Sequence, residues 1–427
     1  MKPLYQLSAV ELSRLIASRK LTAEALTRAC LERIAEREPV VGAWQHLDAD
    51  AAIRTARMID AGPDRGLLHG LPIGVKDLID TGEMPTTYGS PIYADHRPRA
   101  DAACVALARA AGAVPLGKTV TTEFAMFQPG KTANPRNPAH TPGGSSSGSA
   151  AAVADGMVPF AFGTQTAGSI IRPAAYCGVV GYKPTHGVVN RAGVKALCDS
   201  LDTIGVLART VPDAALFVAA VSGRTGLVPG KPLDRPPRIG VVHTHEWKEA
   251  QPETVAALES AAKQLGRAGA ALREIVLPVR FARLVAAQID ILNYETARSL
   301  AWEWLFRRDA ISPKLAQIIV AGNECSPQRY DTALATARAC RQMLPDVMED
   351  VDVLIAPSTQ GEAPAGLGAT GNPIFCRIWT LLHTPCVHIP SATGPNGLPV
   401  GFQVVGRIGA DIDTLLAAHW IHGHAGA

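Results

Sequence analysis

The sequence lacks the marks of several common classes of protein. Its eight cysteines are scattered without a C-x-x-C pair, so we expect reduced thiols rather than a disulfide framework or a zinc knot. No apolar run is long enough for a membrane span, and the N-terminal segment has no apolar core of the signal-peptide type. A formal net charge of +3 over 427 residues gives no reason to expect nucleic acid or a membrane as a partner. Together these absences favour a cytoplasmic location.

What is present is the composition of a large globular core with many turns. Apolar residues make up 47% of the chain, which allows one large α/β domain or two to three average domains. Helical spacing dominates residues 7–60, strand and helix signals alternate over 66–225, and a further mixed part covers 237–425. This mixture predicts an α/β fold in which helices cover both faces of a sheet.

The octapeptide GAVPLGKT at residues 112–119 matches the phosphate-loop pattern G-x-x-x-x-G-K-[ST]. A phosphate loop follows a strand and opens a helix, whose free N–H groups then face the anion. Here a helical pattern ends at Gly112 and a strand-like run follows it, while Pro115 removes one amide donor. We therefore expect Gly112 to cap a helix and the segment to bind no nucleotide.

Three further fragments resemble catalytic motifs but lack the context that each motif needs. Residues 144–148 read G-x-S-x-G, yet the Pro-rich NPRNPAHTPG before them cannot form the buried strand of a nucleophile elbow. Residues 260–263 have S-x-x-K spacing inside a helical pattern, which favours a solvated helix face. His243 and His245 alternate at a strand end with no third ligand in view, which disfavours a metal site.

Residues 137–171 form an unusual stretch in which Asp155 is the one formal charge, apart from whatever His140 carries. The stretch is crowded with Ser, Thr and Gly, as a flexible linker would be. Its segments AAAVA and VPFAF are of core type, however, and lie between the hydroxyl-rich loops. Small-residue loops beside buried elements bring backbone amides close to a reacting carbonyl, so a catalytic site is the alternative to a linker.

These segments give the chain a resemblance to the amidase signature family over nearly its full length. The resemblance implies a single α/β/α domain over residues 1–427 around a large mixed sheet, and an amidase that needs no metal and no cofactor. GGSSSGS, GTQT and the position of Arg172 make the chain look most like the malonamidases, which cleave malonamate-type amides. The matching segments are GLPIGVKD, AGAVPLGKT, NPRNP, TPGGSSSGSAAAVA, GTQTAGSIIRPAAYCGVVGYKPT and LPVGFQVVG.

The family pattern implies a Ser–cis-Ser–Lys triad. Ser169 would attack the amide carbonyl, and Ser145, on a cis bond after Gly144, would connect it to Lys76 as the base. A lysine can act as a base only if its pKa falls well below the free value of about 10.4, and the charge-poor stretch favours such a fall through desolvation. Asp77 is expected to point to the other face of its strand, which would leave Lys76 without a neutralising carboxylate.

The resemblance also assigns the surroundings of this triad. Backbone N–H groups would form an oxyanion hole, and Arg172 would either bind a substrate carboxylate or anchor its own loop. Gln165 and Ala167 stand where the family more often has Asp and Gly, so an ion pair of the wider family is expected to be missing. The residues concerned are Thr166, Ala167, Gly168 and Ser169 for the oxyanion hole, and Arg172, Gly143 and Gly144 for the substrate.

The resulting prediction is a hydrolase of linear amide C–N bonds, rather than peptide bonds, that acts on a small carboxylated, malonamate-like amide. Two alternatives stay open. One is a hydrolase of aryl or aliphatic amides, carbamates or esters with the same mechanism, and the other is the glutaminase-type subunit of an amidotransferase complex. A binding module on an inactive scaffold is disfavoured because all three catalytic positions are filled. A homodimer is left open.

Overall fold

The computed structural model describes residues 2–228 and 230–425. Within them the chain forms one sheet of eleven strands, in the order β1-β3-β2-β4-β6-β5-β10-β11-β9-β7-β8. The strands are β1 (Trp44–Leu47), β2 (Pro72–Lys76), β3 (Val114–Thr119), β4 (Phe160–Gln165), β5 (Val180–Lys183), β6 (Thr203–Ala208), β7 (Arg238–Val242), β8 (Ala271–Ile275), β9 (Val353–Pro357), β10 (Cys386–Thr393) and β11 (Pro399–Val405).

The sheet is mixed. Strand β2 runs parallel to β3 and β4, and β7 runs parallel to β8 and β9, whereas the other neighbouring pairs are antiparallel. The α-helices are α1 (Ala9–Ala17), α2 (Ala23–Val41), α3 (Ala49–Ala61), α4 (Ala103–Ala110), α5 (Ser147–Ala154), α6 (Ile171–Cys177), α7 (Val211–Ser222), α8 (Pro252–Arg267), α9 (Leu284–Ser299), α10 (Ala301–Phe306), α11 (Pro313–Glu324), α12 (Pro327–Val347), α13 (Ile374–Leu381) and α14 (Asp411–His424).

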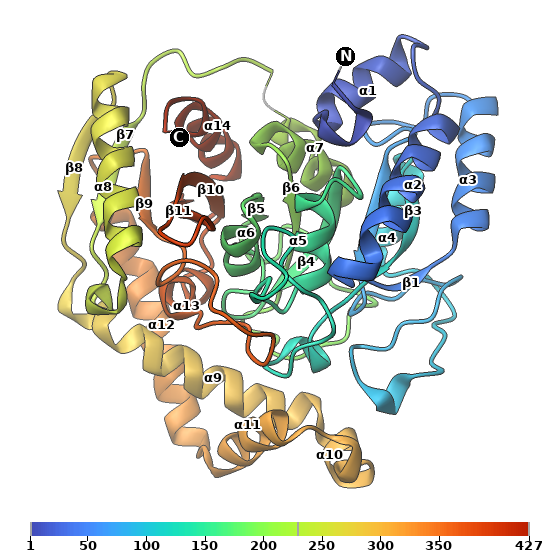
Figure 1. Cartoon of the computed structure of the whole chain (residues 1–427). Coiled ribbons are helices and arrows are strands. Elements are labelled where there is room, and N and C mark those ends of the chain that lie inside the picture. The colour runs from blue at the N-terminus through green and yellow to red at the C-terminus, as the bar shows by residue number, and fades with distance from the viewer. Residues whose placement is uncertain (1, 229, 426–427) are drawn as a thin grey trace.

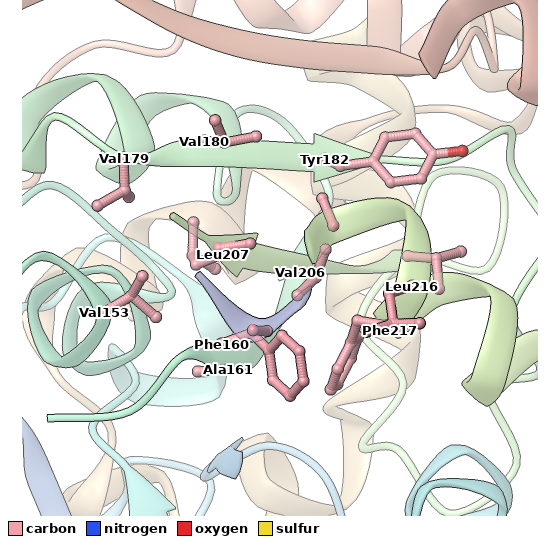
Figure 2. Packing of buried hydrophobic residues seen from close by; sticks show 14 of the residues in the cluster. Val153, Phe160, Ala161, Val179, Val180, Tyr182, Val206, Leu207, Leu216 and Phe217 are labelled. Carbon is pink, nitrogen blue, oxygen red and sulfur yellow. The ribbon is translucent and has the colours of Figure 1, made fainter. Parts of the chain in front are cut away.

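Helices cover both faces of this sheet, which confirms the predicted α/β/α architecture (Figure 1). On one face, α7 packs on β4 through Phe217, whose ring lies 4.9 Å from that of Phe160 (Figure 2). The Phe217 ring also lies 4.7 Å from that of Phe162. Successive strand residues point to opposite faces, so Gly163 points away from α7. A Cβ at Gly163 would lie 3.1 Å from Cγ1 of Ile170, the residue that precedes α6. Helices α5 and α6 therefore lie across the sheet from α7, over the strands that carry the predicted site.

The N-terminal part is less uniform than its spacing predicts. Helices α1, α2 and α3 are confirmed, and Ser8 and Thr22 cap the first two, because each side chain accepts a hydrogen bond at 3.1 Å from the backbone N–H three residues on. Strand β1, between α2 and α3, was missed, because WQHL is too short to show a period of two. Strand β8 was also missed: residues 252–350 show mainly helical spacing in the sequence, and β8 interrupts them at the edge of the sheet.

Helices α9 to α12 form a helical excursion that extends from the C-terminal part of the sheet (Figure 1). Helix α9 contacts α11 and α12 within this excursion, and it also contacts α13, which connects the excursion to the rest of the protein. Gln288 of α9 and Thr380 of α13 each donate a hydrogen bond to the loop after β4. None of the helices in the described ranges is both long enough and apolar enough to cross a membrane.

The GAVPLGKT segment has the order of elements that rules out a phosphate loop. Helix α4 precedes Gly112, which has φ +89°, and β3 follows it, so the segment runs from helix to strand as predicted. Lys118 lies within β3 and is fully buried. Its Nζ donates to Ile79 O at 2.5 Å and to Thr86 Oγ1 at 2.6 Å, and it lies 3.6 Å from Asp77 Oδ1. Burial lowers the pKa of Lys118 to about 8, although the negative charge of Asp77 acts to raise it.

Lys118→Ala is expected to lower the free energy of unfolding by about 3–5 kcal/mol, because it leaves the buried Asp77 carboxylate without its cation. Denaturant unfolding measures this loss, and Lys131→Ala, at a side chain that is 58% exposed, is a control expected to change stability little. Neither the wild-type protein nor Lys118→Ala should bind ATP in calorimetry. Micromolar ATP binding that disappears in Lys118→Ala would contradict this interpretation of the segment.

Candidate active site

Lys76 occupies the last position of β2 and is fully buried. Its Nζ donates to Ser145 Oγ at 2.7 Å and to Thr164 Oγ1 at 2.7 Å. Burial holds the pKa of Lys76 well below its ordinary value, although the negative charge of the Asp202 carboxylate acts to raise it. A lysine in this state carries a lone pair that can take a proton from a hydroxyl group within hydrogen-bond reach.

Ser145 lies at the end of the loop that leads into α5. The Gly144–Ser145 peptide bond is cis, as the resemblance predicted. The loop approaches its neighbours so closely that only glycine fits twice in succession. A Cβ at Gly143, where φ is +78°, would lie 2.9 Å from Pro173 Cα, and a Cβ at Gly144 would lie 2.8 Å from Thr370 Cγ2. The small residues of this block therefore hold the Ser145 hydroxyl against Lys76.

Ser169 ends the loop between β4 and α6, and the four residues 166–169 are fixed through their carbonyl groups. No hydrogen bond from the backbone N–H groups of these four residues to another group is seen in the described chain. A loop whose carbonyls are bound and whose amides are free can present those amides to an anion. The four carbonyls accept from Gln288 Nε2 (Thr166, 3.0 Å), Thr380 Oγ1 (Ala167, 2.8 Å), the Arg172 N–H (Gly168, 2.8 Å) and the Ser146 N–H (Ser169, 3.4 Å).

Gln165 has a clear structural role in place of the Asp that the family more often carries. Its Oε1 accepts from the N–H groups of Ile170 at 2.9 Å and Ile171 at 3.0 Å, at the start of α6. Its Nε2 donates to Thr380 Oγ1 at 2.9 Å, and this hydroxyl donates in turn to Ala167 O. A neutral amide thus clamps both ends of the loop, because it offers an acceptor and a donor where a carboxylate offers acceptors alone.

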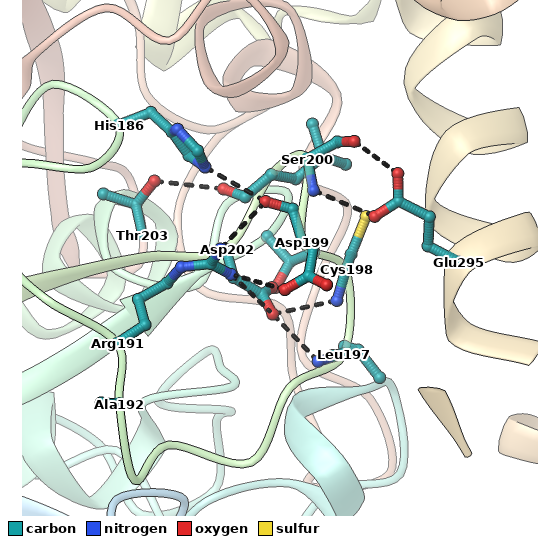
Figure 3. A network of polar contacts seen from close by, with 12 residues as sticks. His186, Arg191, Ala192, Leu197, Cys198, Asp199, Ser200, Asp202, Thr203 and Glu295 are labelled. Carbon is teal, nitrogen blue, oxygen red and sulfur yellow. Dashed lines mark hydrogen bonds and ion pairs between the residues drawn. The ribbon is translucent and has the colours of Figure 1, made fainter. Parts of the chain in front are cut away.

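Asp202 is a functional candidate that the sequence analysis missed (Figure 3). Its Oδ1 accepts from Thr166 Oγ1 at 2.6 Å, and its Oδ2 accepts from the N–H groups of Leu197 and Cys198, both at 2.9 Å. Arg191 Nη1 lies 3.9 Å from Oδ2. A cavity of about 250 Å³ is lined by both Asp202 and Thr164. Asp202 therefore connects the loop of residues 166–169 with the surroundings of Lys76.

The prediction that Asp77 lies apart from Lys76 agrees with the structure, but Lys76 still has a carboxylate nearby. Asp77 accepts from Thr87 and lies beside Lys118. Asp202 is the carboxylate that raises the pKa of Lys76. The spacing of β2 predicted the direction of Asp77, whereas nothing in the sequence pairs position 202 with position 76. The one local signal was the dense hydroxyl content around Thr164 and Thr166, which indicated partners for a polar network.

Arg172 lies in α6 and is 3% exposed. Its Nη2 donates to Gly144 O at 2.7 Å and to Thr370 Oγ1 at 3.1 Å. Its Nε and Nη1 are buried and have no hydrogen-bond partner among the described residues. Burial lowers the pKa of this guanidinium. Arg172 thus anchors the Ser145 loop and still has two nitrogens whose N–H groups are free, so both predicted roles fit its contacts.

The remaining motif fragments lie away from this cluster. Residues 260–263 lie within α8, where Ser260 and Lys263 are exposed, as a solvated helix face requires. His243 follows β7 and lies 3.6 Å from Glu274, while His245 contacts a backbone carbonyl. Across residues 2–228 and 230–425, no group of three or more His, Cys, Asp or Glu is arranged to hold a metal ion. Neither fragment adds a group to the candidate active site.

Comparison with known proteins identifies the kind of hydrolase. The A-type subunit of glutamyl-tRNA(Gln) amidotransferase from Thermosynechococcus vestitus is 34% identical over 93% of this chain and 94% of its own length. A solved amidase structure shares 31% identity and a TM-score of 0.90, covering 98% of this chain and 100% of the other. The peptide amidase of Stenotrophomonas maltophilia shares 29% identity and a TM-score of 0.83, covering 99% of this chain and 98% of the other.

These similarities, with the fold, define a hydrolase of C–N bonds on an α/β/α scaffold. The Amidase family model matches residues 25–415, so the chain belongs to the amidase signature family. The relatives include amidases and a subunit of an amidotransferase. The more specific similarity to malonamidases stays a prediction.

Proposed function

We propose that the protein hydrolyses a small amide through an acyl-enzyme on Ser169. The Ser169 Oγ attacks the carbonyl carbon, and its proton passes to Ser145 Oγ while the proton of Ser145 passes to Lys76 Nζ. The oxyanion lies against the free N–H groups of residues 166–169. Lys76 returns the proton through Ser145 to the departing nitrogen, the C–N bond breaks, and water then hydrolyses the acyl ester by the same relay.

One observation carries this proposal: a buried lysine, with its pKa held well below its ordinary value, donates to Ser145 Oγ at 2.7 Å. A charged lysine in this position could not serve as a base, and an exposed one would be protonated at neutral pH. The free N–H groups of residues 166–169 give independent support, because an acyl-transfer site needs donors for the developing oxyanion.

For the substrate, we propose a small amide with a carboxylate a few bonds from the scissile carbonyl, as in malonamate. The support is Arg172, three residues after Ser169, whose buried Nε and Nη1 lack partners. A buried guanidinium with free donors is costly unless an anion binds there. Such a pair holds the substrate and also orients it.

Two other functions remain candidates on specific observations. The bond from Arg172 to Gly144 O would be enough for an anchoring role, and the substrate would then be an uncharged amide, carbamate or ester. The 34% identity to a component of an amidotransferase favours a role in which ammonia passes to a partner protein. We propose the free-standing hydrolase as the leading function, in the cytoplasm, where the eight buried free cysteines of the described chain would stay reduced.

The test is a panel of amides scored for ammonia release by the purified chain alone. The panel pairs malonamate and succinamate with neutral amides of similar size, and includes glutamine and a C-terminally amidated dipeptide, each assayed with and without EDTA. The proposal predicts release from the carboxylated small amides, unchanged by EDTA. Ammonia release that requires co-purifying subunits would favour the amidotransferase role, and loss on chelation that zinc restores would contradict the metal-free mechanism.

Asp202→Asn is expected to lower kcat and to shift the pH profile. Activity requires neutral Lys76, so it rises as pH increases through the pKa of Lys76. Asp202 raises that pKa, so removing its charge lowers it, and the acid limb should move to lower pH. The weakened bond to Thr166 should cost about 1.5–3 kcal/mol in kcat, the value of a hydrogen bond to a charged group.

Thr166→Val is the matched control, because it removes the same hydrogen bond but leaves the carboxylate charge in place. It should lower kcat without moving the acid limb. Asp199→Asn, at a side chain that is 80% exposed, should change neither. An unmoved acid limb in Asp202→Asn would show that Asp202 only supports the loop.

A further inference from the structure

A second buried arginine lies beside the candidate active site, on a different element from Arg172. Arg377 belongs to α13 and is 8% exposed. Its Nη1 donates to Gln288 Oε1, and no other hydrogen bond from this guanidinium is found in the described ranges. Burial, and after it the positive charge of Arg172, lowers the pKa of Arg377 to about 10. The two arginines lie close together, because Gly168 accepts from the Arg172 N–H at 2.8 Å and lies against Cys376, the residue before Arg377.

The packing of α13 places Arg377 next to the loop that carries Ser169. A Cβ at Gly168 would lie 3.0 Å from Cys376 Cβ, so the helix lies directly on this loop. Gln288 of α9 connects the two, because its Nε2 donates to Thr166 O at 3.0 Å while its Oε1 accepts from Arg377. Gln288 therefore fixes Arg377 relative to the four free N–H groups of the loop.

The charges of this pair are not balanced by the protein. None of the ion pairs found among the described residues joins a carboxylate to Arg172 or to Arg377. The ionisable groups that face them are Tyr176 and Cys376, and burial raises the pKa of each to about 12, so both are neutral at physiological pH. Two buried cations without a counter-charge are strongly unfavourable, so an anion is expected to lie between them when the site is in use.

We propose that Arg377 forms a second anion subsite, and that the preferred substrates are small amides bearing two acidic groups, one bound by Arg172 and the other by Arg377. This inference rests on the proposed amide hydrolysis and narrows its substrate class from monoanions to dianions. Arg377 also has a simpler role as a clamp on Gln288. The two roles differ in what they predict for binding, because a clamp is indifferent to the charge of the ligand.

Straight-chain dicarboxylates from oxalate to adipate, and the monoamide of each, test this directly by calorimetry on Ser169→Ala, which cannot turn the amides over. With two cations in the site, at least one dicarboxylate should bind about tenfold or more tighter than its monoamide. Arg377→Gln in the same background should abolish this preference, and Arg377→Lys should restore part of it, since an ammonium keeps the charge but not the planar fork. Arg307→Gln, at an exposed position, should leave the preference intact.

Equal binding of every dicarboxylate and its monoamide would overturn the inference, and so would a preference that survives in Arg377→Gln. If Arg377→Gln fails to fold, Ser169→Ala with Arg377 intact can still be compared with Ser169→Ala that also carries Arg377→Lys. A role limited to holding Gln288 predicts that the dicarboxylate preference does not change between these two proteins.

Ammonia release by the wild-type protein is a separate readout. Release from carboxylated amides without a dicarboxylate preference leaves the proposed function standing and removes only the second subsite. A preference without any amide hydrolysis supports the subsite and contradicts the proposed function.

Discussion

Ser169→Ala is expected to release no measurable ammonia from any amide that the wild-type protein hydrolyses. The change removes the atom that would form the acyl-enzyme, so the reaction would have to proceed by direct attack of water. We expect a loss of about 10⁴-fold or more in kcat, the scale on which removal of a covalent nucleophile acts. Initial rates of ammonia release on the best substrate of the panel measure this effect.

Ser145→Ala and Lys76→Ala are each expected to cost several orders of magnitude in kcat. The three groups act as one unit, so the triple variant should be little slower than Ser169→Ala alone. Ser147→Ala is a matched control in the same serine-rich block, since its Oγ bonds the backbone of Val120 rather than Lys76. Effects that simply add across the three substitutions would contradict a shared proton relay.

Arg172→Ala is expected to lower kcat/KM for a carboxylated amide by about 2–4 kcal/mol, the scale of breaking a buried charge pair. A neutral amide of similar size should lose far less, because it makes no contact with the guanidinium charge. Arg172→Lys should recover only part of the loss, since an ammonium cannot reproduce the bidentate fork. The measurement is kcat/KM for malonamate and for a neutral amide in each of the three proteins.

The comparison between the two substrates separates substrate binding from loop anchoring. Arg172 also bonds Gly144 O and Thr370, so some loss on both substrates is expected from loosening the Ser145 loop. Equal losses on both substrates would show that anchoring is the whole role of Arg172. The substrate would then be an uncharged amide, carbamate or ester. The proposed pair of anion subsites, at Arg172 and Arg377, would also be contradicted.

Local spacing predicted the parts of the site that lie on short, continuous segments. The alternation in β2 placed Lys76 and Asp77 on opposite faces, and the structure agrees, because Asp77 pairs with Lys118. The order of helix, glycine and strand around Gly112 excluded a phosphate loop, since a motif acts only in its structural context. The resemblance to a family placed Ser145 and the cis bond before it, which periodicity alone does not indicate.

The missing parts of the site come from segments far away in the chain. Asp202, Gln288 and Arg377 reach the Ser169 loop only because the sheet and the helical excursion bring β6, α9 and α13 beside it. Sheet order is not encoded in local periodicity, and the crossings between β2, β4 and β6 follow from packing of the whole domain. Strands β1 and β8 were missed for a related reason, because both are short and lie at the sheet edges, where alternation is weak.

The identity of the acylated residue tests the mechanism most directly. The protein is mixed with an activated half-ester of malonic acid, which transfers the same malonyl group as malonamate, quenched with acid within one turnover, digested and sequenced by tandem mass spectrometry. The mechanism predicts one acyl group on Ser169, absent from Ser169→Ala and strongly reduced in Lys76→Ala. An acyl group on any other residue, or full turnover of the ester by Ser169→Ala, would contradict it.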